Sequence, residues 1–230
     1  MISIQEYLGR NAYPGRGLLI GATPEGRNAV AYFIMGRSEN SKNRVFVPQG
    51  NDLRTKAFDP KKMTDPSLII YYPVREHEGH TIVTNGDQTD TVLEHLCSGG
   101  TFEEAMHTRT FEPDAPHYTP RISGILYPDG SYSISILKAE GNDPNRSLRA
   151  FYHYDRAISG AAHLIHTYAG DGNPLPPFYG EPVAVQVTGD IDDFAQSLWN
   201  ALNPAYRVSL FVRFTGKSGA KEDRIINAHG

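Results

Sequence analysis

The sequence predicts an α+β fold with largely antiparallel sheets. Strand patterns are numerous, helical patterns are few and come late, and the regular strand–helix alternation of a doubly wound fold is missing. Of the 230 residues, 39% are hydrophobic and 21% charged, as in globular proteins. Sheet patterns on both sides of Gly170–Pro182, which is rich in Gly and Pro, indicate a structured loop rather than a linker. We therefore expect a single domain over residues 1–230.

Composition limits the classes of function. No apolar run approaches the ~20 residues of a membrane span, and Met1 to Arg10 lacks the pattern of a signal peptide. Cys97 is the only cysteine, which excludes an internal disulfide and favours a reducing cytoplasm. The net charge of −4 argues against a nucleic-acid partner. A few converging arginines could still hold a small anion.

The first third of the chain has strand patterns. Gly17–Thr23 and Ala29–Met35 are apolar and β-branched, and the turn signal Pro24 to Arg27 joins them as a hairpin. Further strands are expected at Arg44–Val47, Leu68–Tyr72 and Thr81–Thr84. The last of these ends at a turn dipeptide, Asn85-Gly86.

Two helical patterns occupy the middle of the chain and one the last quarter. Asp90–Cys97 places Val92, Leu93, Leu96 and Cys97 on one apolar face. Thr101 is expected to cap a second helix that continues to Met106. Apolar residues from Ile191 to Leu202 follow the helical period most clearly, and Asn203-Pro204 ends that helix.

The second half supplies the remaining strands. Tyr132, Ile134 and Ile136 alternate with serines, which predicts a half-buried strand paired with Ile122–Tyr127. Other strands are expected at Leu148–Tyr154, Val183–Val187 and Val208–Phe214. The segment Tyr206–Phe214 is open to interpretation as an edge strand.

Three groups of residues could carry chemistry. Arginines cluster in the first fifth of the chain and could grip a phosphate, although a solvated face explains any one of them: Arg10, Arg16, Arg27, Arg37 and Arg44. Thr84–Asp90 joins a strand to a helix and could bind an anion, or merely cap the helix. Phe111–Ile122 is a proline-stiffened loop with several titratable groups, which suits either an active site or surface ion pairs.

Metal and cofactor motifs are not evident. His77 and His80, like His163 and His166, lie three residues apart without a third ligand in any zinc pattern, so we interpret them as structural or surface residues rather than metal ligands. Cys97 belongs to the apolar face of its helix and is expected in the core. Glycine-rich nucleotide loops are missing, so no cofactor is expected.

Several segments, taken in their order along the chain, together resemble the archaeal-type IMP cyclohydrolase family. The resemblance covers roughly the first 125 residues, a span of about one domain. They are Tyr7-Leu8-Gly9-Arg10, Gly26-Arg27, Ala31-Tyr32, Arg37-Ser38, Asn43-Arg44, Ser67 to Tyr71, Arg75, Thr84-Asn85-Gly86, Thr89-Asp90, Glu112, Asp114 and Thr119-Pro120-Arg121-Ile122. Asn11 to Gly15 are extra residues relative to the family, and Asp87-Gln88 replace its small residues.

The resemblance implies a four-layer αββα fold, similar to that of the N-terminal-nucleophile hydrolases. It implies cyclisation of 5-formamidoimidazole-4-carboxamide ribonucleotide to IMP, with no metal or organic cofactor. The implied catalytic residues are Tyr71, Asn85, Glu112 and Arg121, with Glu112 as base, Tyr71 or Arg121 acting on the formyl oxygen, and Asn85 orienting the base or carboxamide. The implied substrate contacts are Arg10, Arg27, Arg37, Ser38, Arg44, Asp114 and Thr119.

Two other functions are compatible with the residues. One is an amide hydrolase of the same fold, which would need internal cleavage because Ile2 follows Met1. The other is a noncatalytic protein that binds a purine nucleotide. The expected partner in each case is a small molecule rather than nucleic acid or membrane, and self-association into a homo-oligomer is open.

Overall fold

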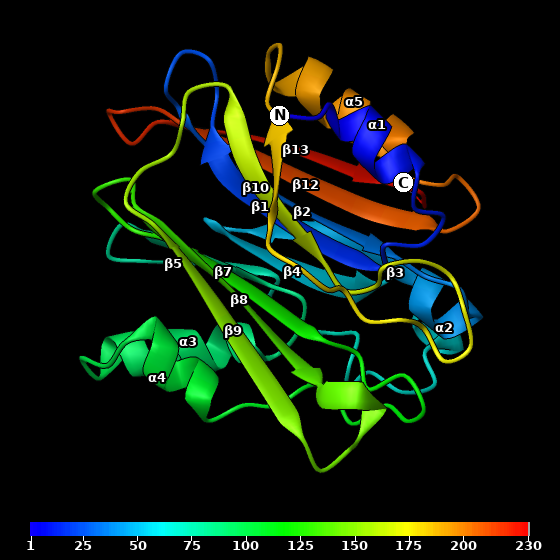
Figure 1. Ribbon diagram of the computed structural model, residues 1–230. Coiled ribbons are helices and arrows are strands. Elements are labelled where there is room, and N and C mark those ends of the chain that lie inside the picture. The colour runs from blue at the N-terminus through cyan, green and yellow to red at the C-terminus, as the bar shows by residue number, and fades with distance from the viewer. Residues whose placement is uncertain (230) are drawn as a thin grey trace.

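Two antiparallel sheets stacked face to face form the centre of the protein. The computed structural model describes residues 1–229. Figure 1 shows helices on the outer side of each sheet, with α1 (Ile4–Gly9) and α5 (Ile191–Ala201) over one and α3 (Gln88–Cys97) and α4 (Phe102–His107) over the other. The first sheet has the order β11 (Val183–Gln186), β10 (Ala161–His166), β1 (Arg16–Ala22), β2 (Asn28–Met35), β12 (Arg207–Thr215) and β13 (Lys221–Asn227). The second has the order β3 (Arg44–Gln49), β4 (Asp52–Ala57), β5 (Val74–His77), β6 (His80–Thr84), β7 (Arg121–Leu126), β8 (Tyr132–Ala139) and β9 (Ser147–Tyr154).

Alternation along the strands of the first sheet fills two separate cores. Leu18 and Ile20 of β1 pack into the space between the sheets. Leu19, between them in sequence, points the other way and packs with Phe194 and Leu198 of α5. Successive side chains of a strand point to opposite faces, so an entirely apolar strand must be covered on both sides. This explains why β1 and β2 read as continuous apolar runs.

The second sheet is covered in the same way. Its residues Ile134 and Ile136 pack into the core between the sheets. Its opposite face contributes Ile125 and Leu137 to a third core with Val92 of α3 and residues of α4. The layers are therefore helices, sheet, sheet and helices, and the α+β class with mostly antiparallel pairing is confirmed.

The predicted helices form as expected. Thr101 caps α4, its hydroxyl accepting from the Glu104 amide while the Glu104 carboxylate accepts from the Thr101 amide. Asp190 caps α5 through the amide of Asp193. Two further short helices are α1 and α2 (Glu39–Lys42). No helix within residues 1–229 is long and apolar enough to cross a membrane.

Two sequence interpretations were wrong because neighbouring segments changed the local environment. Leu68–Tyr72 is not a strand: the amides of Ile69 and Ile70 both donate to the Pro66 carbonyl, which folds the segment into a turn. β8 is not half-buried, because α3 and α4 cover its serine face, and Ser135 is as buried as the apolar residues beside it.

Other corrections concern Cys97 and β12. Cys97 is exposed rather than in the core, since it is the last residue of α3 and its sulfur lies 3.8 Å from Nε2 of His77. β12 is not an edge strand, because it pairs with β2 on one side and with β13 on the other. The remaining strand predictions in the second half are confirmed, and strands β4, β5, β10 and β13 were not predicted.

Candidate active site

Strand ends from both sheets meet at one end of the molecule. β1 begins at Arg16 and its partner β2 ends at Met35, while β6 ends at Thr84 and its partner β7 begins at Arg121. Antiparallel pairing thus places these four chain positions at one end of their sheets. A cavity of about 300 Å³ opens there. Its lining residues are Tyr13, Arg16, Met35, Ser38, Asn40, Ser41, Arg44, Asp65, Leu68, Ile69, Glu112 and Asp114.

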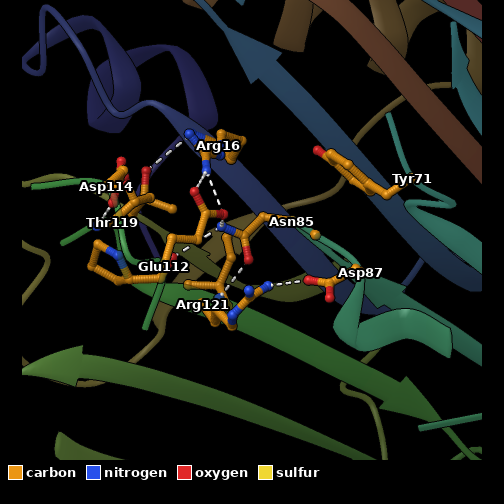
Figure 2. A network of polar contacts seen from close by, with 12 residues as sticks. Arg16, Tyr71, Asn85, Asp87, Glu112, Asp114, Thr119 and Arg121 are labelled. Carbon is orange, nitrogen blue, oxygen red and sulfur yellow. Dashed lines mark hydrogen bonds and ion pairs between the residues drawn. The ribbon is translucent and has the colours of Figure 1, made fainter. Parts of the chain in front are cut away.

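A buried ion pair forms one wall of the cavity. Nη2 of Arg16 donates to both carboxylate oxygens of Glu112, at 2.6 and 2.7 Å, and the Glu112 side chain is 2% exposed (Figure 2). Burial raises the pKa of Glu112 above the ordinary glutamate value, and Arg16 offsets this only in part. Nε of Arg16 is also buried and has no partner among the described residues. The Glu112 carboxylate therefore accepts a proton more readily than an ordinary glutamate does.

The cavity lining also includes a second buried cation, Arg44, which has no counterion among residues 1–229. Arg44 is 1% exposed, and its Nε donates to the carbonyl of Ser41 at 2.8 Å. No carboxylate in residues 1–229 forms an ion pair with Arg44, and burial lowers the pKa of its guanidinium. A buried unpaired charge is costly, so an anion in the cavity would be strongly favoured.

Asn85 holds the Glu112 loop rather than facing the cavity. Its Nδ2 donates to the Pro120 carbonyl at 2.9 Å and lies 3.5 Å from Oε1 of Glu112. Its Oδ1 accepts from the amide of Ile122 at 2.8 Å and from Gln88 at 2.9 Å. Every polar atom of this fully buried side chain thus forms hydrogen bonds within the protein. Asn85 therefore holds the loop of Glu112 in place.

Arg121 lies on the same side but is held by acidic and amide partners. Its Nη1 donates to Oδ1 of Asp87 and to Oε1 of Gln88, both at 2.6 Å (Figure 2). Asp87 also accepts from Arg109. Arg121 does not line the cavity, although its charge lowers the pKa of Glu112.

Tyr71 directs its hydroxyl toward the Arg16–Glu112 pair (Figure 2). Its hydroxyl lies 2.7 Å from that of Tyr32 on β2. Burial raises the pKa of Tyr71, against the opposing effect of Arg44 and Arg16. Tyr71 is therefore protonated at neutral pH and can donate a hydrogen bond, which makes it better placed than the engaged Arg121 to act on a carbonyl oxygen.

Asp114, Thr119 and Ser38 belong to the cavity region. Oδ1 of Asp114 accepts from the Thr119 amide at 2.7 Å, and its other oxygen accepts from the Thr119 hydroxyl, which also contacts Tyr168. These bonds close the loop that carries Glu112. Ser38 lines the cavity, but its hydroxyl accepts from the amide of Ser41 at 3.1 Å.

The other predicted arginines are not brought to the cavity. Arg27 precedes β2, whose far end lines the cavity, and pairs with Glu222 at 3.0 Å. Arg10 is exposed and pairs with Glu6. Arg37 pairs with Asp171 at 2.7 Å and contacts the cavity only through the ring of Tyr13, on which it stacks.

Sequence reasoning left Arg16 out of the site, although it belonged to the arginine cluster. The pair that it forms joins positions 96 residues apart, so no local spacing indicates it. Among residues 1–229 no cluster of three or more metal-ligating side chains occurs. His163 and His166 contact the hydroxyls of Tyr132 and Tyr7, respectively, which agrees with a structural role.

The fold and cavity define an α+β protein with a cavity at one end of its two stacked sheets, lined by a buried arginine without an ion-pair partner among residues 1–229 and by a buried carboxylate. The chain belongs to the IMP cyclohydrolase-like protein family, whose model matches residues 13–219.

Individual archaeal proteins named IMP cyclohydrolase are similar to parts of this chain. The protein from Halobacterium salinarum is 30% identical over 132 residues, which are 56% of this chain and 64% of that protein. The protein from Methanopyrus kandleri is 34% identical over 116 residues, 49% of this chain and 58% of that protein. One from Methanococcus maripaludis is 30% identical over 159 residues, 66% of this chain and 77% of that protein. The first two matches thus span less than two thirds of those relatives.

Proposed function

We propose that this protein is an IMP cyclohydrolase, a hydrolase-class enzyme acting on a cyclic amidine C–N bond in purine biosynthesis. In the biosynthetic direction it would close 5-formamidoimidazole-4-carboxamide ribonucleotide to IMP with loss of water. Family membership and relatives bearing that name support the proposal. The observation that carries it is the cavity itself, whose lining includes both a buried Arg44 without an ion-pair partner among residues 1–229 and a buried Glu112.

Arg44 supplies the anchor for the substrate. Guanidinium groups bind phosphate through paired hydrogen bonds, and a buried one gains most from an anionic partner. A cavity of about 300 Å³ lies at the lower end of the range for small-molecule sites. We assign the phosphate of the nucleotide to Arg44. We assign the reacting groups to Glu112, which lines the cavity, and to Tyr71, whose hydroxyl is directed toward the Arg16–Glu112 pair.

The chemistry needs one base and one acid. Glu112 takes a proton from the carboxamide nitrogen as this nitrogen forms a bond to the formyl carbon, and Tyr71 protonates the formyl oxygen. Protonated Glu112 then gives its proton to the hydroxyl of the adduct, which leaves as water. The Tyr71 phenolate takes the proton of the formamido nitrogen as a C=N bond completes the aromatic ring, so both side chains return to their starting states. Because both reacting groups belong to one molecule, holding them in attack geometry supplies much of the acceleration. No step of this scheme calls for a metal or an organic cofactor.

The proposal also covers the fold relationship, the domain organisation and the cellular location of the protein. The order of layers agrees with a relationship to the N-terminal-nucleophile hydrolases, and residues 1–230 would act as one domain. A cytoplasmic location follows from the proposed reaction, because phosphorylated purine precursors are kept inside cells. The geometry of the site gives no reason for or against a homo-oligomer.

The direct test mixes purified protein with the formamido nucleotide, without added metal, and follows IMP formation by absorbance. Glu112→Gln should lower turnover at least about tenfold, because a general base contributes ~10²–10⁴-fold. Glu76→Gln is a matched control, since Glu76 is also a largely buried carboxylate paired with an arginine, Arg213, at 2.8 Å. Unchanged turnover in Glu112→Gln would remove its assignment as base. No IMP formation by folded wild-type protein would reject the proposed function.

A further inference from the structure

The hydroxyl of Tyr32 has a single hydrogen-bond partner among the described residues. It lies in β2, is 0% exposed, and approaches the Tyr71 hydroxyl at 2.7 Å. Its charged neighbours are Arg16 and Arg44, which affect the pKa of Tyr32 in the same direction. The two tyrosines therefore form a closed pair of hydroxyls between two guanidinium groups.

The direction of this hydrogen bond follows from the donors and acceptors present. A guanidinium has no acceptor, so neither arginine can take the proton of Tyr32. A fully buried donor must nevertheless be satisfied, and the only acceptor within reach is the Tyr71 oxygen. Tyr71 is 6% exposed, so its proton can reach a ligand whereas the proton of fully buried Tyr32 cannot, and we assign Tyr32 as the donor and Tyr71 as the acceptor. The proton of Tyr71 has no acceptor within residues 1–229 and is free for a ligand.

We propose that Tyr32 is a positioning residue that fixes the Tyr71 hydroxyl, so that its proton points at the substrate's reacting oxygen. This inference rests on the proposed function, in which Tyr71 is the acid. The accepted hydrogen bond also polarises the Tyr71 O–H bond and strengthens it as a donor.

The backbone of Tyr71 is already held in place by other hydrogen bonds. Tyr32 therefore needs to fix only the orientation of the Tyr71 hydroxyl. The amide of Tyr71 donates to Oγ1 of Thr55 at 2.8 Å, and the carbonyl of Tyr71 accepts from the amide of Thr55 at 3.0 Å. These bonds anchor the Tyr71 backbone to β4. Removing the Tyr32 hydroxyl should thus free the rotation of one O–H bond while leaving the ring in place.

The test is Tyr32→Phe, which keeps the ring and deletes only the donor. We expect kcat to fall about tenfold while KM changes by less than about twofold, because the loss affects the transition state rather than ground-state binding. Tyr132→Phe is the matched control: Tyr132 belongs to the same inter-sheet core and bonds His163 at 2.6 Å, away from the cavity. Its kcat should equal that of the wild type. An equal decrease in both variants would overturn the proposal.

A double variant and a spectroscopic measurement complete the test. Tyr32→Phe in a Tyr71→Phe background should cost no further kcat, and an additive loss would overturn the role through Tyr71. In protein labelled with ¹³C at the phenolic carbon of tyrosine, the signal that disappears in Tyr71→Phe should shift in Tyr32→Phe. No shift would overturn the hydrogen bond. This readout needs no turnover, so it decides the positioning contact even if wild-type protein fails to make IMP.

Discussion

Arg44 is a buried charge whose counterion must come from outside the protein. Replacing a buried, unpaired charge by an apolar side chain of similar length removes a desolvation cost. We therefore expect Arg44→Met to keep or increase the free energy of unfolding of the ligand-free protein. The same variant should raise the Kd for IMP at least about tenfold, since a hydrogen bond to a charged group is worth ~1.5–3 kcal/mol. Calorimetric titration and urea unfolding measure the two effects.

Arg213 provides the contrast. It is 3% exposed but is paired with Asp223 at 2.7 Å and with Glu76 at 2.8 Å. Arg213→Met should destabilise the fold, because it removes a buried partner shared by two carboxylates, and should leave IMP affinity unchanged. Destabilisation of Arg44→Met by a similar amount would mean that Arg44 has a structural role instead.

Glu112 should govern the acid limb of the pH–rate profile. A base works only when deprotonated, so kcat/KM should rise with pH through the pKa of Glu112 in the free enzyme. Burial raises that pKa, and the limb should lie above the ordinary glutamate value of about 4.3. The residual activity of Glu112→Gln should lack this limb. Persistence of the limb in the variant would assign it to another group.

At the scale of single elements, the hydrogen bonds of His166 join β10 to α1. Nε2 of His166 lies 2.8 Å from the Tyr7 hydroxyl, and Nδ1 lies 3.0 Å from the Tyr168 carbonyl. Because a carbonyl only accepts, Nδ1 carries the proton and Nε2 accepts from Tyr7. Burial lowers the pKa of His166 from 6.5 to about 4, so the folded protein holds this ring neutral.

That neutral ring predicts a pH-dependent stability. Above pH 6.5 the histidine is neutral in both states, and its contribution is fully present. As the pH falls toward 4, His166 binds a proton in the unfolded chain but not in the folded protein, so the free energy of unfolding decreases. Between pH 7 and pH 5 the loss should be about 2 kcal/mol. Urea unfolding of wild type and His166→Gln should show the advantage of the wild type shrinking by that amount, and a constant difference would contradict the prediction.

Local sequence predicted those elements whose signals are local. The cap at Thr101 and the amphipathic pattern of α5 follow from neighbouring residues alone. β13 escaped prediction because it is a charged edge strand whose pairing with β12 supplies its order. Leu68–Tyr72 has an apolar composition typical of a strand, but two of its residues, Leu68 and Ile69, serve as cavity wall. Tertiary contacts thus overrode local preference in both cases.

At the scale of the whole molecule, the candidate site depends on the spacing of the two sheets. Arg16 comes from the first sheet, whereas Glu112 and Arg121 adjoin the second. The sequence predicted Glu112 through its loop, yet its partner Arg16 became evident only when the sheets were stacked. A contact between sheets depends on the register and packing of many strands, which no segment of the sequence specifies alone.

Gly124 lies at a close contact between the two sheets. A Cβ atom built on Gly124 in β7 would lie 2.7 Å from Cδ1 of Ile20 and 3.3 Å from Cδ1 of Leu18, both in β1. Gly124→Ala and then Gly124→Val should therefore force the sheets apart by increasing amounts, at a cost of about 1–3 kcal/mol in the free energy of unfolding. Because Arg16 and Arg121 begin the same two strands, we expect kcat/KM to fall with the size of the added side chain.

Activity and stability should separate this effect from ordinary overpacking. Gly9→Ala is the control, since nothing lies within 4 Å of the position that its Cβ would occupy. It should keep or raise the unfolding midpoint, since alanine favours a helix more than glycine does, and should leave kcat/KM unchanged. In the Gly124 series, kcat/KM of the fully folded protein should decrease at temperatures well below unfolding, because the Arg16–Glu112 pair and Tyr71 shift relative to one another. If the series loses stability while the folded protein keeps its kcat/KM, the site tolerates sheet separation, and the loop of Glu112 rather than the stacking of the sheets sets its geometry.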